Sequence, residues 1–260
     1  MKPSEDEVYA RLKVLMYVVV HALATPRPML NEYFAKWSEK ERSDFDDACK
    51  QHAESNATKM QMAGLWEYAS PSEKAFLQSF GSQMDEYAHK AATWRMECAG
   101  TLMWALGFLN RFPVLDEQIN PDLMKSVTAK RFGLFRKRPR LRPQNEISAR
   151  RDLIELWHWR VRTRRLIEEG KPFEADENMK RVGIASFDDI VRFSAKAAHA
   201  KGDLPELKDD DFVFLGKSFR TLPTEEYQMA TSIIMERHYA LNWLCGMAQE
   251  NRWDETPTDT

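Results

Sequence analysis

The sequence predicts a mainly α-helical protein: a single compact multi-helix domain with a buried central helix and at most a short strand pair. Glycine is sparse, at 10 of 260 residues, and the helix-favouring Leu, Ala, Glu, Lys, Arg and Met are abundant. Hydrophobic residues make up 43% of the chain and charged residues 30%, as in ordinary globular proteins. Because no repeat and no long linker interrupts the chain, residues 1–260 are expected to form one domain.

The first helix is expected from about residue 5, where apolar residues recur one turn apart at Val8, Leu12, Leu15 and Val19. The prolines of residues 25–28 end it. The apolar run inside this helix has acids before it and no net positive charge, so a buried helix is favoured over an export signal. No run is long enough to span a membrane. A cytoplasmic protein is therefore expected.

Three further helices can be placed from local signals. Ser70, Pro71 and Glu73 form the pattern of a capped helix start. Residues 94–112 carry apolar side chains on every side, which predicts the buried central helix. A third helix is expected over residues 147–169, where Gly170 can cap its end.

The C-terminal part is predicted to begin with a helix opened by Ser186. Residues 209–219 form the one stretch with an extended pattern, and Thr224 is expected to cap a final helix that runs to about residue 249. The tail, residues 250–260, is expected to fold back on the body because Trp253 is costly to leave in water.

A basic stretch covers residues 130–165, with thirteen Lys or Arg and three acids in a chain whose net charge is −2. Its first part, residues 130–143, has two prolines and no helical period, which indicates a basic connector or protruding loop. Arginine and tryptophan are typical of protein interfaces. The candidate partner-binding residues are Arg136, Arg138, Arg140, Arg142, Trp157, Trp159 and Arg162. The alternatives are nucleic-acid binding, which lacks a recognisable motif here, and internal pairing with the acidic remainder.

Polar residues also fall inside two apolar segments, and the candidates are Arg95, Glu97, Glu236, Arg237, His238 and Asn242. A buried charge without a partner costs several kcal/mol. We therefore expect Arg95 to face Glu236 and Glu97 to face Arg237, with His238 beside them. This cluster is expected to be either a structural network or a polar ligand pocket with perturbed pKa values. In helical geometry His238, Asn242 and Cys245 share a face and could line such a pocket.

Motifs for phosphate, nucleotide or metal binding are missing from the sequence, and the six histidines show no paired helical spacing. The three cysteines lie far apart without a C-x-x-C pair, which favours reduced thiols. The sequence thus predicts no cofactor and no metal site.

Four segments resemble the bacterial domain-of-unknown-function family 4272: residues 94–107 (WRMECAGTLMWALG), 150–162 (RRDLIELWHWRVR), 236–246 (ERHYALNWLCG) and 253–260 (WDETPTDT). Weaker likeness extends to residues 11–15 and 65–77. The resemblance implies a compact intracellular bacterial protein and supplies no catalytic residues.

Three functional hypotheses follow. The leading one is a non-enzymatic protein-binding module that neutralises or escorts an acidic protein partner. The second is an enzyme or small-ligand binder that uses the Arg, Glu and His cluster. The third is nucleic-acid binding through residues 130–165.

Overall fold

The computed structural model describes residues 1–24, 34–122 and 140–258. In these ranges the regular structure consists of eight α-helices, five short 3-10 helices and one two-stranded antiparallel hairpin, which confirms the mainly α-helical prediction. The α-helices are α1 (Glu5–Ala24), α3 (Glu39–Met62), α4 (Pro71–Gln78), α5 (Glu86–Ala105), α7 (Gln144–Glu168), α8 (Glu177–Arg181), α9 (Phe187–Lys201) and α10 (Thr224–Leu244). The strands are β1 (Val213–Phe214) and β2 (Lys217–Ser218).

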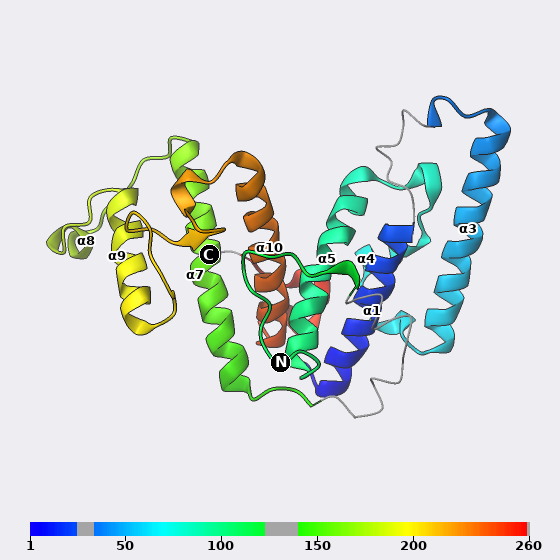
Figure 1. Cartoon of the computed structure of the whole chain (residues 1–260). Helices are drawn as coiled ribbons and strands as arrows, with labels where there is room; N and C mark the ends of the chain where they lie inside the picture. The colour runs from blue at the N-terminus through cyan, green and yellow to red at the C-terminus, as the bar shows by residue number, and fades with distance from the viewer. Residues whose placement is uncertain (25–33, 123–139, 259–260) are drawn as a thin grey trace.

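The long helices stand side by side in the order α3, α1, α5, α10, α7 and α9 (Figure 1). Helices α5 and α10 run in the same direction at the centre, whereas α1 and α7 run the opposite way on either side of them. The hairpin lies beside α7 and α9, and the short helix α8 lies at the outer end of the row.

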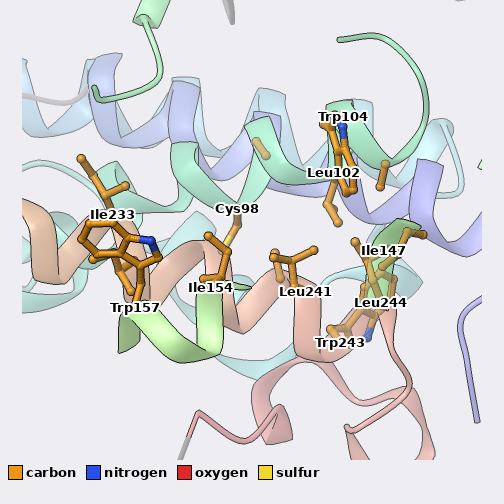
Figure 2. Packing of buried hydrophobic residues seen from close by; sticks show 14 of the residues in the cluster. Cys98, Leu102, Trp104, Ile147, Ile154, Trp157, Ile233, Leu241, Trp243 and Leu244 are labelled. Carbon is orange, nitrogen blue, oxygen red and sulfur yellow. The ribbon is translucent and has the colours of Figure 1, made fainter. Parts of the chain in front are cut away.

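The core lies where α5, α10 and α7 meet (Figure 2). Leu102 from α5, Leu241 from α10 and Ile154 from α7 are each fully buried there. Every residue of α5 from Glu97 to Ala105 is buried, as expected for the central helix. A helix buried on all sides must satisfy each polar side chain that it carries, and this requirement shapes the site described below.

Local capping signals explain the helix starts that the sequence predicted. The Ser70 side chain accepts a hydrogen bond from the Glu73 backbone N–H, and the Glu73 carboxylate accepts one from Ser70, with Pro71 at the first position of α4. Ser186 caps α9 in the same way through the Asp189 backbone N–H. A side-chain cap of this kind stabilises a helix by about 1 kcal/mol.

Several predicted helix boundaries were wrong. Helix α5 starts earlier than residue 94 because the Asp85 side chain caps it. It ends before residue 112 because Gly107, with φ of +73°, turns the chain out of the helix. Helix α10 ends at Leu244 because Gly246 adopts φ of +76°, and Thr224 makes no side-chain cap at its start. The short helix α8 was not predicted.

The extended stretch is a hairpin arm with two tight turns. Asp209 and Asp210 both have positive φ, as do Leu215 and Gly216 between the two strands. Consecutive positive φ angles fit the twist of antiparallel strands. Asp211 is fully buried and accepts two hydrogen bonds of 2.7 Å from Arg160, which fastens the arm to α7.

The described part of the C-terminal tail, residues 250–258, lies back against the helices. Trp253 is 2% exposed and makes edge contacts with the rings of Tyr239 and Trp243. Asp254 accepts hydrogen bonds from the backbone N–H and the hydroxyl of Ser72 at the start of α4. The tail thereby links α10 to the N-terminal half of the row.

Candidate functional site

Three consecutive residues of α10 contact three different neighbours. Successive side chains on an α-helix point about 100° apart. Glu236 therefore meets Arg95 of α5, Arg237 meets Glu97 of α5 and the loop that follows it, and His238 meets α7. We call this arrangement the α10 polar layer.

Arg237 is the most completely bound residue of the layer. Its Nε and Nη2 donate to Glu97 Oε2 at 2.9 and 2.8 Å. Its remaining N–H groups donate to the backbone oxygens of Pro113, Val114 and Glu117, at 2.7 to 2.9 Å. The Arg237 and Glu97 side chains are 0% and 1% exposed, and burial raises the pKa of the Glu97 carboxyl. All five donors of the guanidinium are used, so this pair acts as an anchor for the loop after α5.

Glu236 and Arg95 form a second, less buried ion pair of 3.1 Å, the pairing that the sequence led us to expect. The Arg95 guanidinium lies 4.6 Å from the centre of the Tyr239 ring. The Cys98 thiol donates to the backbone oxygen of Glu236 at 3.0 Å, and burial raises the pKa of this thiol well above its usual range. This pair therefore joins α5 to α10 beneath the tail, and Cys98 is kept as an uncharged thiol.

His238 does not join the ion pairs. Its Nδ1 lies 2.9 Å from Nδ1 of the buried His158 on α7, so one ring donates and the other accepts. Burial, together with the charges of His158 and Arg151, lowers the pKa of His238 to about 3. One turn later, the Asn242 amide oxygen accepts from Arg151, and its nitrogen donates to the Pro257 backbone oxygen. The shared face of His238, Asn242 and Cys245 is thus packed against α7.

A cleft of about 910 Å³ lies next to this layer. Its walls are the loop 110–116, one face of α7, the turn 202–206 and the hairpin residues 213–216. Two arginines hold the loop 110–116 in place. Arg237 is the first, because it donates hydrogen bonds to the backbone oxygens of Pro113 and Val114. Arg142 is the second, because it donates hydrogen bonds to the backbone oxygens of Leu109 and Asn110. The loop wall is therefore held at two points.

Arg150 of α7 is one of the residues that line this cleft, and we call the cleft the Arg150 cleft. The guanidinium lies 4.9 Å from the centre of the Phe112 ring and is partly buried, and burial lowers its pKa. Within the described part of the chain it makes no hydrogen bond or ion pair. A partly buried cation over an aromatic ring, without a carboxylate partner, is a ready site for an anionic group.

The neighbouring arginines of α7 are used differently. Arg151 pairs with Glu155 at 2.6 Å, and Arg160 pairs with the buried Asp211. Arg164 donates to the backbone oxygens of Phe219 and Leu222. Several arginines of the basic stretch are thus bound to partners inside the protein, which agrees with the alternative of internal pairing.

The predicted partner-binding residues do not form one surface. Trp157 is 4% exposed and packs its ring against Phe212 and Phe219, so it does not lie on an open surface, although it is among the residues that line the Arg150 cleft. Trp159 is partly buried, Arg142 lines the Arg150 cleft, and Arg140 and Arg162 are exposed. Arg136 and Arg138, with most of the predicted connector 130–143, lie outside the described residues. The periodicity of the helix accounts for the burial of Trp157, because its position faces the core.

The comparison with protein families decides the classification. Residues 2–181 match the model of the domain of unknown function DUF4272. The chain belongs to this family. No curated protein and no solved structure matches the chain. The wall of the Arg150 cleft that is formed by residues 202–206 and by Val213, Phe214 and Gly216 lies beyond the part matched to DUF4272.

Metal ligands and membrane-spanning helices can be considered for residues 1–24, 34–122 and 140–258. In these ranges no group of three His, Cys, Asp or Glu side chains could hold a metal ion. None of the helices described has the length and apolar character needed to cross a membrane.

Arg150 and Phe112 were not among the residues predicted from the sequence. Arg150 stands in a run with Arg151, and nothing in the local pattern separates the paired arginine from the unpaired one. Phe112 was assigned to the end of the central helix, whereas it lies in the loop that forms the cleft wall. A helical projection of residues 144–168 places Arg150 on the same face as Leu153 and Trp157, which is the one available signal.

Proposed function

We propose that this DUF4272 protein is a non-catalytic binding protein that accepts a segment of a partner protein in the Arg150 cleft. The observation that carries the proposal is the unpaired Arg150 in a cleft of about 910 Å³, a size typical of ligand-binding sites. Aromatic and aliphatic side chains beside a few polar groups are the usual composition of such a site. Arginine at the centre of an apolar contact is also typical of interface hot spots.

The α10 polar layer gives less support to the enzyme hypothesis. Glu97 and Arg237 are bound to each other and to the backbone, away from solvent. Glu97 and Glu236 line neither the Arg150 cleft nor a second cleft, of about 440 Å³, that lies between the start of α4 and the tail residues 250–255. A catalytic acid or base must reach the proton that it transfers. The layer therefore fits the structural alternative better.

Nucleic-acid binding is likewise less favoured. Binding to phosphates requires several basic side chains that are free to contact the backbone of the nucleic acid. On α7, Arg151, Arg160 and Arg164 are held by internal partners.

A reducing, cytoplasmic setting is part of the proposal and is supported by the three free cysteines.

The test blocks the cleft without changing the core. Ala149 is an exposed residue of α7 that lines the cleft, and Ala197 is an exposed residue of α9 away from it. Tagged wild-type protein, Ala149→Trp and Ala197→Trp are compared by nuclease-treated affinity capture and quantitative mass spectrometry. We expect a protein partner to be retained by the wild type and Ala197→Trp and lost by Ala149→Trp. Equal retention by both variants, or no partner of the wild type, would contradict the proposal.

A further inference from the structure

The surroundings of Arg150 specify the charge of the group that it binds. A partly buried cation is stabilised when an anion completes its hydrogen bonds. The Arg150 side chain has its guanidinium on the Phe112 ring and, among the described residues, no acceptor. The positive charge and the unused donors of Arg150 therefore favour an anionic group at this one position of the cleft.

The cleft also distinguishes between kinds of anion. Four acidic residues line it: Asp116, Glu146, Asp203 and Glu206. They oppose a phosphate, which carries close to two negative charges, more strongly than a carboxylate with one. The fork of a guanidinium can bind either anion through two parallel hydrogen bonds, so the acidic residues of the lining decide between them. A single carboxylate is thus the anion that fits best.

Apolar walls surround the position of the carboxylate. Phe112 and Leu153 lie on the Arg150 side of the cleft, and Leu204 and Phe214 lie on the opposite side. Leu204 and Phe214 are themselves 2% and 1% exposed, so the accessible apolar surface of the cleft belongs mainly to the partly buried Phe112 and Leu153 and to Val114, which is 56% exposed. An acidic residue flanked by large apolar residues would cover these walls and bring its carboxylate to the guanidinium.

We infer that Arg150 binds the side-chain carboxylate of an acidic residue that is flanked by large apolar residues in the partner segment. This inference rests on the proposed function and names the chemistry of the occupant. Arg150 is then the residue that selects the segment, and Phe112 holds its guanidinium in the orientation for binding.

The experiment uses the full chain, labelled with ¹⁵N, and two capped peptides that differ in one group. The probes are acetyl-Leu-Glu-Phe-amide and acetyl-Leu-Gln-Phe-amide, titrated while amide signals of residues that line the cleft are followed. We expect the Glu peptide to bind about tenfold or more tightly than the Gln peptide, because a hydrogen bond to a charged group is worth about 1.5–3 kcal/mol. A phosphoserine peptide of the same frame is expected to bind more weakly than the Glu peptide.

Variants assign the difference to Arg150. Arg150→Gln should lower the affinity for the Glu peptide to that for the Gln peptide and leave the latter unchanged. Arg150→Lys should restore part of the preference. Arg165→Gln is the matched control, since Arg165 lies on the same helix with a 65% exposed side chain paired to Glu169. It should behave as the wild type.

The outcomes separate this inference from the proposed function. Equal binding of the two peptides, tighter binding of the phosphoserine peptide, or no binding of any of them would overturn the carboxylate assignment. Partner capture that is lost by Ala149→Trp would in that case still support the binding function. Conversely, a Glu preference that depends on Arg150, beside partner capture that Ala149→Trp does not reduce, would uphold the anion site and overturn the protein-binding function.

Discussion

Two arginines lie against the ring of Phe112 and are used in opposite ways. The Arg237 guanidinium is 5.9 Å from the ring centre and has all five donors bound. The Arg150 guanidinium is 4.9 Å from the same ring and has no bound partner in the described part of the chain. The first is closed inside the protein, and the second borders a cleft.

The difference shows how one loop can serve structure and binding together. Arg237 fixes the loop from the inside through backbone oxygens that would otherwise be buried without donors. The fixed loop then presents Phe112 to Arg150 on the outside. Removal of either arginine therefore has a different expected consequence: a loss of stability for Arg237 and a loss of recognition for Arg150.

The largest effect is expected for Arg237→Met. The substitution leaves the Glu97 carboxylate buried without its cation and three backbone oxygens without a donor, which should cost about 3–5 kcal/mol of unfolding free energy. Urea unfolding followed by circular dichroism measures it. The double variant Glu97→Gln with Arg237→Met should recover part of the loss, because the stranded charge is removed. A loss of unfolding free energy below about 0.5 kcal/mol would show that Arg237 does not stabilise the fold, which would contradict its structural role.

The second effect is a dependence of stability on pH that originates at His238. The unfolded histidine takes up a proton as the pH falls below 6.5, whereas the folded one resists protonation until a pH of about 3. The unfolded state thus binds more protons in this window, and stability is lost as the pH falls, by up to about 1.4 kcal/mol per pH unit. Urea unfolding between pH 7 and pH 4 measures the slope.

His238→Gln is the comparison for that slope, since glutamine does not titrate. We expect a shallower decline of unfolding free energy with acid in the variant than in the wild type. Identical slopes would show that His238 is protonated in the fold and would sink the assignment of a neutral His158–His238 pair.

A smaller effect is expected for Arg142→Gln. Arg142 donates to three backbone oxygens around the end of α5, and its side chain is 23% exposed. Solvent can replace part of these bonds, so a loss of about 1.5 kcal/mol is expected, between those of Arg237 and Arg150. Arg165→Gln serves as the control by urea unfolding. A loss equal to that of Arg237→Met would mean that the outer support matters as much as the inner one.

The smallest effect is expected for Arg150→Gln. No partner is left unpaired by this substitution among the described residues, so the unfolding free energy should change by less than about 0.5 kcal/mol. A loss of 2 kcal/mol or more in urea unfolding would show that Arg150 has a structural partner, and the contrast with Arg237 would disappear.

Local signals in the sequence were sufficient for much of the fold. Ser70 and Ser186 cap helices through contacts within three residues, so no knowledge of tertiary structure was needed. The pairs Arg95–Glu236 and Glu97–Arg237 could be expected because buried charges in two apolar helices must find partners. Helix ends were less accessible, because they depend on backbone turns such as the one at Gly107.

The rest depended on how distant segments meet. The pairing of His238 with His158 follows from α7 lying against α10, which no local pattern states. That Arg150 has no partner among the described residues is even harder to predict from the sequence, because it is recognised only when the partners of the other arginines on α7 are known. The cleft itself combines segments from residues 104 to 216.

The most direct test of the contrast is partner capture by Arg150→Gln and Arg165→Gln side by side, with urea unfolding of both proteins in parallel. We expect wild-type stability for both variants and loss of the partner by Arg150→Gln alone. Retention of the partner by a stable Arg150→Gln variant would contradict the claim that the unpaired arginine of the cleft is the residue that recognises it.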